Sequence, residues 1–214
     1  GNITVAHGLG SSPKVVITKV RDQAFNWVVG HHKIASDFSS GATLNSTGSA
    51  ADNSDAFGDT APSSTVFTMG NGGNANNNYQ SGDDIVAYYF DEVQGFSKFG
   101  SYEGNGHATD GPFVYLGFKP AWLLYRNIDR SENWLIEDNK RNPHNRVAGA
   151  KLQANVPDAE TNETRWGFDF LSNGFKVRQT EAQNANNGNG ETIIYMAFAE
   201  HPFVSSEGVP VTAR

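Results

Sequence analysis

The sequence repeats itself, and this feature constrains the fold more than any other. Pro13–Lys19 (PKVVITK) aligns with Pro120–Arg126 (PAWLLYR), and an Asn-Trp pair follows each, as Asn26-Trp27 and Asn133-Trp134. Three more pairs of segments keep the same offset of 107 or 108 positions: Gly41–Leu44 with Gly149–Leu152, Ser64–Phe67 with Ser172–Phe175, and Ile85–Glu92 with Ile193–Glu200. This constancy predicts a duplicated unit of about 90 residues, covering residues 3–93 and 112–201.

The segments within each copy have the pattern of short β-strands. Apolar residues alternate or run together briefly, and clusters of Gly, Asn and Ser separate them. No long segment has the spacing of an amphipathic helix. We therefore predict an all-β fold, an antiparallel β-sandwich or jelly roll in two tandem copies. The predicted strands are Ile3–His7, Val15–Val20, Trp27–His31, Thr43–Asn45, Val66–Met69 and Ile85–Val93 in the first copy, Phe99–Tyr102 between the copies, and Phe113–Gly117, Trp122–Asn127, Trp134–Asp138, Lys151–Gln153, Phe168–Leu171, Phe175–Arg178 and Thr192–Glu200 in the second.

The repeat also predicts the domain organisation. Residues 1–98 form a first sandwich, and residues 99–214 hold a connector strand, a second sandwich and a tail; one pseudo-symmetric sandwich is the alternative. Ile85–Phe90 and Ile193–Ala199 are nearly continuous in apolar residues, which predicts central strands covered on both faces. The repeat-equivalent Trp27 and Trp134 are predicted to anchor the cores.

Composition excludes several classes of partner and cofactor. The net charge of −7 argues against nucleic acid and against anionic membrane surfaces, since both require basic patches. The chain has no cysteine, which excludes disulfides and thiolate metal sites. No apolar run approaches the length of a membrane-spanning helix, so no membrane insertion is expected.

No catalytic constellation, metal site or cofactor motif is predicted. His31 and His32 would point to opposite faces of an extended strand, and His31 is repeat-equivalent to Asp138, so the position is simply polar. Glu92 and Glu200 are also repeat-equivalent, which predicts a structural role such as pairing with a basic group or a backbone amide. We expect a protein that is not an enzyme and binds no cofactor.

The loops are the candidate ligand-binding regions. Gly70–Gly82 and Glu181–Gly190 are rich in Asn and Gly, and amide groups with exposed aromatic rings are typical of sugar-binding loops. The alternative is that Asn and Gly only supply turns with positive φ. Specific function is expected where the copies differ. The candidate ligand-binding residues are Asn74, Asn76, Tyr79, His107 and Trp166.

Five longer segments carry a resemblance: Ala6–Pro13 (AHGLGSSP), Tyr88–Gly106 (YYFDEVQGFSKFGSYEGNG), Gly111–Pro120 (GPFVYLGFKP), Phe168–Val177 (FDFLSNGFKV) and Ile194–Phe203 (IYMAFAEHPF). Together they resemble a repeat domain of uncharacterised virion proteins from marine tailed phages. This resemblance implies a location on the virion surface, in a tail fibre or a similar structure, among other virion proteins. It implies no catalytic residue and no ligand.

The leading expectation is a bacteriophage virion surface protein, a distal tail-fibre module that contributes to attachment to host-surface glycans. A homotrimer is expected by analogy with tail fibres, and the sequence itself does not show it. The first alternative is a capsid decoration or a fibre spacer with no ligand. The second is a polysaccharide depolymerase, which would need two carboxylates facing each other across a cleft.

Overall fold

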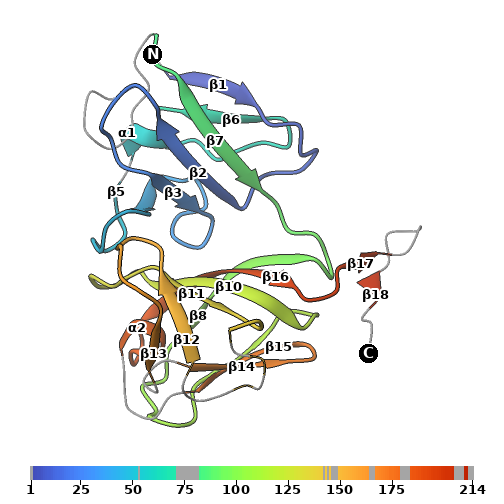
Figure 1. The fold of residues 1–214 in the computed structure, drawn as a ribbon. Coiled ribbons are helices and arrows are strands. Elements are labelled where there is room, and N and C mark those ends of the chain that lie inside the picture. The colour runs from blue at the N-terminus through green and yellow to red at the C-terminus, as the bar shows by residue number, and fades with distance from the viewer. Residues whose placement is uncertain are drawn as a thin grey trace. The chain divides into compact units, whose positions relative to one another are not determined.

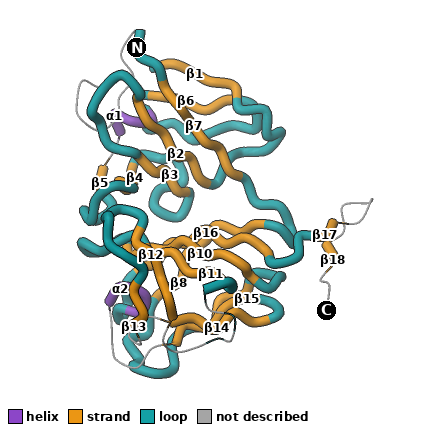
Figure 2. Tube along the Cα trace, viewed as in Figure 1, coloured by secondary structure: helices purple, strands orange, loops and turns teal. Residues whose placement is uncertain are grey.

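The computed structural model describes residues 2–52, 54–70, 82–141, 143, 145, 149–163, 167–178, 184–204 and 210–211. The chain divides into two compact units, Gly1–Asp91 and Glu92–Arg214 (Figure 1). Strands form nearly all the regular structure in both units (Figure 2). Their pairing is antiparallel, which confirms the predicted all-β, sandwich-like class. Each of the two helices described has four residues, far fewer than a helix needs to cross a membrane.

In the first unit, a two-stranded sheet packs on a five-stranded sheet. The strand orders are β1-β6 and β5-β4-β3-β2-β7. The elements are β1 (Ile3–Ala6), β2 (Val15–Val20), β3 (Val28–His31), β4 (Ser40–Thr43), β5 (Ala51–Asp52), α1 (Ser54–Phe57), β6 (Val66–Met69) and β7 (Ile85–Phe90). Apolar side chains between the two sheets form the core, among them Val16, Val28, Phe57 and Phe67.

In the second unit, a three-stranded sheet (β14-β15-β9) packs on a six-stranded sheet (β13-β12-β11-β10-β16-β8). The elements are β8 (Ser97–Glu103), β9 (Phe113–Tyr115), β10 (Pro120–Asn127), β11 (Leu135–Asp138), β12 (Gly149–Gln153), β13 (Thr161–Glu163), β14 (Gly167–Leu171), β15 (Gly174–Arg178), α2 (Asn184–Asn187) and β16 (Thr192–Ala199); β17 (Phe203–Val204) and β18 (Pro210–Val211) pair near the C-terminus. Its core includes Leu123, Tyr125, Phe175 and Tyr195.

The strands that the two units share are arranged in the same topology. The order β5-β4-β3-β2-β7 corresponds strand by strand to β13-β12-β11-β10-β16, and β1 pairs with β6 as β9 pairs with β15. The repeat-equivalent Phe67 and Phe175 are both fully buried, because each lies on the inward face of its strand. The sequence duplication is therefore a duplication of the fold.

Three differences from the sequence predictions have clear causes. The boundary between the units lies at residue 91 rather than 98, because β8 pairs along its whole length with β16. Trp134 is buried as predicted, whereas Trp27 is only partly buried. Ile193–Ala199 is central, between β10 and β8, but β7 is an edge strand among the described elements because its sheet has no counterpart of β8.

Candidate functional site

Two exposed aromatic side chains lie side by side on the outer surface of the small sheet in the second unit. Phe113 and Tyr115 are 45% and 60% exposed, while Val114 between them is buried in the core. This follows from the alternation of side chains along a strand. Tyr115 lies opposite Gly174, which has no side chain to cover the ring. We call the outward-facing residues of this sheet the aromatic face: Phe113, Tyr115, Asp169, Leu171, Lys176 and Arg178.

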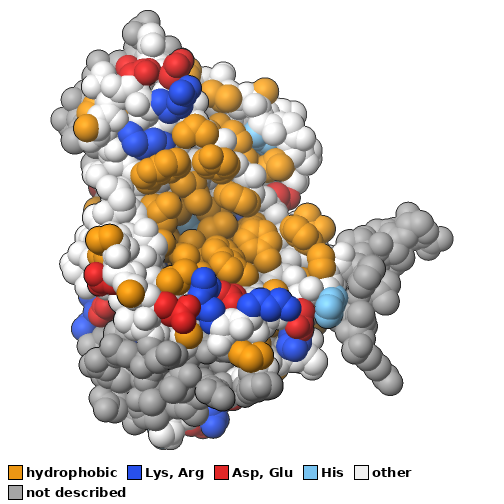
Figure 3. Space-filling model, viewed as in Figure 1, with side chains coloured by type: hydrophobic (Ala, Val, Ile, Leu, Met, Phe, Trp, Pro, Cys, Tyr) orange, Lys and Arg blue, Asp and Glu red, His pale blue; other side chains and the backbone are white. Residues whose placement is uncertain are grey.

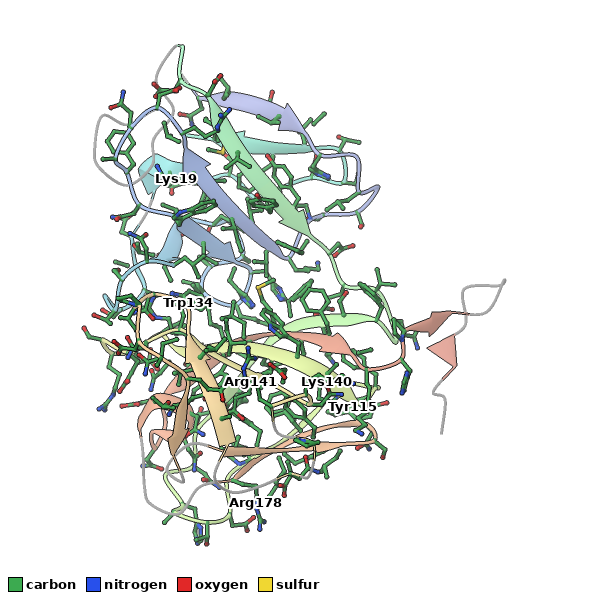
Figure 4. The ribbon with its side chains drawn as sticks, viewed as in Figure 1. Lys19, Tyr115, Trp134, Lys140, Arg141 and Arg178 are labelled. Carbon is green, nitrogen blue, oxygen red and sulfur yellow. The ribbon has the colours of Figure 1, made fainter. Side chains whose placement is uncertain are left out.

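Charged groups surround these two rings. Lys176 lies opposite Phe113, and its Nζ is 2.5 Å from Asp110 Oδ1. The hydrogen bond from Lys176 lowers the pKa of the Asp110 carboxyl. Arg178 Nε is 3.5 Å from Asp169 Oδ2 on the neighbouring strand. Figure 4 labels Tyr115 and Arg178. The aromatic face thus combines apolar rings with hydrogen-bonding groups whose charges are largely neutralised.

Lys98 supports the Tyr115 side of this surface. Its Nζ lies 5.5 Å from the centre of the Tyr115 ring, within the range of a cation–π contact, and donates to the Tyr115 carbonyl at 3.2 Å. Lys98 belongs to β8, so the six-stranded sheet helps to fix the edge strand β9 of the small sheet. The Tyr115 ring therefore contacts Lys98 and still has most of its surface exposed.

The first unit has no such surface at the equivalent place. Val5 opposite Phe67 corresponds to Val114 opposite Phe175, and this inward pair is retained. The outward positions differ: Thr4 and Ala6 stand where the second unit has Phe113 and Tyr115. Inward residues are kept by core packing, so the outward difference is not required by the shared fold. It marks the aromatic face as specific to the second unit.

The loop with His107 adjoins the aromatic face through Asp110. The buried Asn187 accepts a hydrogen bond from Asn105 N at 2.9 Å and donates to the His107 carbonyl at 3.0 Å. His107 Nδ1 in turn accepts from Thr109 N at 3.2 Å and Asp110 N at 2.9 Å. The His107 side chain is exposed, but three hydrogen bonds hold the residue in place, one at its carbonyl and two at Nδ1.

Glycines allow this loop to pack tightly against the end of α2. A side chain on Gly104 would overlap the carbonyl oxygen of Gly188, and Gly106 has a φ of +66°. The side-chain amide of Asn187 bonds to Asn105 twice: its Oδ1 accepts from Asn105 N, and its Nδ2 donates to Asn105 Oδ1. In the loop with His107, the Gly residues therefore allow a turn and a close contact, and the Asn side chains bond within the protein.

The structure describes only one of the five predicted ligand-binding residues. His107 lies beside the aromatic face, whereas Asn74, Asn76, Tyr79 and Trp166 lie outside the described residues. Phe113 and Tyr115 were missed as site residues, although their segment was predicted as a strand. The detectable signal was the difference between Phe-Val-Tyr at 113–115 and Thr-Val-Ala at 4–6.

The other polar residues singled out by the sequence have structural roles. Glu92 Oε1 accepts a hydrogen bond from Phe99 N at 2.9 Å, and Glu200 pairs with Lys119 at 2.7 Å, the two kinds of partner predicted. His31 and His32 do not point to opposite faces; their rings stack 5.2 Å apart because the chain turns after His31. Among the described residues, no three His, Asp or Glu side chains gather as a metal site would require.

Charges elsewhere on the second unit are also paired. Arg141 bonds to Asp138 and lies 2.7 Å from Glu160, and Arg130 bonds to Glu191. Figure 3 shows acidic and basic side chains side by side on one face of this unit. Paired charges of opposite sign create little net field at these surfaces. The chemistry that the aromatic face can perform is stacking and hydrogen bonding.

Comparison with known proteins gives one match. No curated protein and no solved structure matches the chain. A family model described as "Domain of unknown function (DUF7483)" matches residues 1–202, a span that includes the first unit and the second unit as far as β16. The match thus covers both copies of the repeat. The chain belongs to the DUF7483 family.

Proposed function

We propose that this protein is a virion surface structural protein, a distal tail-fibre module whose second unit contributes to attachment to host-surface glycans. The observation that carries the proposal is the aromatic face. Sugar rings stack their apolar faces on aromatic side chains, and their hydroxyls bond to nearby carboxylates and amines. Phe113 and Tyr115 supply the rings, and Asp110, Asp169 and Lys176 supply the hydrogen-bonding groups.

The charge pattern supports a neutral saccharide. Both carboxylates beside the rings have a basic partner, Lys176 for Asp110 and Arg178 for Asp169. Hydroxyl groups can share such paired groups without adding charge, whereas an anionic sugar would compete with the carboxylates already bound to the bases. We therefore expect uncharged hexose-containing glycans to bind in preference to sialylated or sulfated ones.

Binding of the fluorescently labelled full chain to an array of bacterial surface glycans tests this proposal. Wild-type protein should bind a group of neutral glycans, and the Phe113→Ala, Tyr115→Ala double variant should lose about tenfold in affinity, which corresponds to about 1.4 kcal/mol. Thr4→Ala, at the position equivalent to Phe113, is the matched control and should bind as wild type does. Absence of binding by the wild-type chain to every glycan would contradict the proposal.

A second function, a decoration or spacer without a ligand, is favoured by one observation. The amide groups of Asn105 and Asn187 are used inside the protein, so this loop serves packing rather than recognition. Labelled antibody on intact particles separates the two functions. Label at the tail tip supports attachment, and label along the head or the fibre shaft supports the structural role.

A further inference from the structure

The six-stranded sheet of the second unit contains a pairing that the first unit lacks. β8 pairs with β16 over seven positions, with Ile193 opposite Tyr102, Tyr195 opposite Gly100 and Ala197 opposite Lys98. Gly104 N donates to Glu191 O at 2.9 Å, and Ala199 N donates to Phe96 O at 2.8 Å. Since hydrogen-bonded residues alternate along an antiparallel strand, the odd-numbered residues of β16 bond to β8. The even-numbered residues bond to β10, as Ile128 N does to Thr192 O at 3.0 Å.

The same alternation shows which backbone groups of β7 are already used. Arg21 N donates to Asp84 O at 2.7 Å, so Val86, Tyr88 and Phe90 direct their N–H and C=O groups toward β2. Ile85, Ala87 and Tyr89 direct theirs toward the opposite side. These three residues are repeat-equivalent to Ile193, Tyr195 and Ala197, whose backbone groups bond to β8. Within the described part of the first unit, no strand pairs on this side of β7.

The residues of β7 are also more exposed than their equivalents on β16. Ile193, Ile194, Tyr195, Met196 and Ala197 on β16 are all between 0% and 4% exposed. Every residue of β7 is at least partly exposed. Tyr88 is 50% exposed, whereas its equivalent Met196 is 4% exposed. A flat strand edge with unpaired backbone groups and apolar side chains is a template for pairing with another strand.

We propose that the open edge of β7 accepts an antiparallel strand from another polypeptide segment that has the pattern of β8. The first unit would then complete the same six-stranded order that the second unit builds from its own chain. The pairing adds a strand to a sheet, a mode of recognition in which backbone hydrogen bonds give affinity and alternate side chains give specificity.

The second unit indicates what that strand must carry. Phe99 of β8 lies opposite Met196 and packs edge-on against Phe198 at 5.7 Å between ring centres. The equivalent positions in the first unit are Tyr88 and Phe90. Three residues after Phe99, Tyr102 lies opposite Ile193, the equivalent of Ile85. The fitting partner is therefore an extended segment with aromatic residues three positions apart, as in Phe99-Gly-Ser-Tyr102.

Amide hydrogen exchange on the intact 214-residue chain, with residue resolution, tests the proposal. Without a partner, the amides of Ile85, Ala87 and Tyr89 should exchange quickly, while those of Ile193, Tyr195 and Ala197 in the same molecule should be protected. A synthetic peptide with the sequence of residues 95–105 should then slow exchange at the three β7 amides. A scrambled peptide of equal composition should have no effect.

Ala87→Pro is the matched variant. The Ala87 N–H faces the open edge, so a proline there removes no bond to β2 and is tolerated as in other edge strands. This variant should keep protection at Val86 and Tyr88 but lose the response to the peptide. Three results would overturn the proposal: protection of Ile85, Ala87 and Tyr89 without peptide, no slowing at saturating peptide, or protection that depends only on protein concentration, which would indicate pairing of β7 with a second copy.

Discussion

Asn155 Oδ1 accepts a hydrogen bond from Trp134 N at 2.9 Å, and Asn45 makes the same 2.9 Å bond to Trp27 N in the first unit. Each Asn also donates from Nδ2 to the Asn that precedes the Trp, Asn133 or Asn26. The residue before each Asn also donates its backbone N–H to the carbonyl of the Trp at 2.9 Å, Ala154 to Trp134 and Leu44 to Trp27. The repeated Asn-Trp motif therefore ties the start of β11 or β3 to the end of β12 or β4. It does so whether the indole is buried or not.

Removal of this Asn side chain should destabilise the unit that contains it. We expect Asn155→Ala to lower the free energy of unfolding of the second unit by about 1–2 kcal/mol, because the partly buried Trp134 N–H and Asn133 side chain lose their partners. Asn155→Asp keeps the acceptor for Trp134 N and should cost less. Amide exchange of β11 and β12, followed at increasing urea concentration, measures the stability of the second unit in both variants.

The first unit supplies the control for this effect. Asn45→Ala should destabilise the first unit through the same lost bonds and leave the amide exchange of β11 and β12 unchanged. If Asn155→Ala and wild type unfold at the same urea concentration, the motif does not contribute to stability.

The buried Glu137 should make the second unit less stable as pH rises. Glu137 is 2% exposed, and burial raises the pKa of its carboxyl from 4.5 to about 8, against the opposing effects of a hydrogen bond from Tyr125 at 3.2 Å and of the charge of Lys151. The folded state therefore retains a proton that the unfolded state loses. The stability that this proton contributes is fully present below pH 4.5 and is lost as the pH rises to about 8. Over this range the free energy of unfolding falls by at most about 1.4 kcal/mol per pH unit.

Glu137→Gln isolates this titration. Glutamine keeps the size of the side chain and an acceptor for the Tyr125 hydroxyl, but it has no proton to lose in this range. The difference in unfolding free energy between Glu137→Gln and wild type should grow between about pH 5 and pH 8 and then level off. A difference that does not change with pH would show that the carboxyl has an ordinary pKa.

The repeat made much of the fold predictable, because equivalent strands keep equivalent inward residues such as Phe67 and Phe175. The role of β8 could not be predicted in the same way. Its segment was recognised as a strand from its own pattern, but pairing with β16 depends on residues nearly a hundred positions away. The outward direction of Phe113 and Tyr115 was hidden for a related reason. Local alternation fixes that Val114 faces the other side, but only the partner strand decides which side is the core.

The histidines show how a local interaction can imitate a candidate site. His7, His31 and His107 all use Nδ1 to accept a hydrogen bond from the backbone N–H two residues later. Asp138, the equivalent of His31, makes the same bond to Lys140 N. In each case the side chain accepts a hydrogen bond within a local turn, as Asp and Asn side chains commonly do. Sequence composition alone does not distinguish this role from ligand binding.

His107 should accordingly be found with its proton on Nε2. Nδ1 can accept from Thr109 N and Asp110 N only while it is unprotonated, so the neutral ring must be the Nε2–H tautomer. Long-range ¹⁵N–¹H NMR spectra near neutral pH distinguish the two forms. His107→Asn preserves an acceptor and should keep the Thr109 and Asp110 amides protected from exchange, whereas His107→Ala should expose them. An Nδ1–H tautomer would be incompatible with this geometry.

Gly174 should be essential for the attachment of β9, and with it for the aromatic face. A Cβ at this position would overlap the carbonyl oxygen of Val114, because the backbones of β15 and β9 meet there without an intervening side chain. A backbone atom cannot yield as a flexible side chain can, so Gly174→Ala should separate the two strands and destabilise the second unit by about 1–3 kcal/mol. Faster amide exchange in β9 and a lower urea midpoint are the expected readouts. Gly48→Ala is the matched control, since its new methyl group would meet nothing closer than 3.8 Å, and it should leave both measurements unchanged. Equal stability of the two variants would show that β9 can shift to accommodate a methyl group.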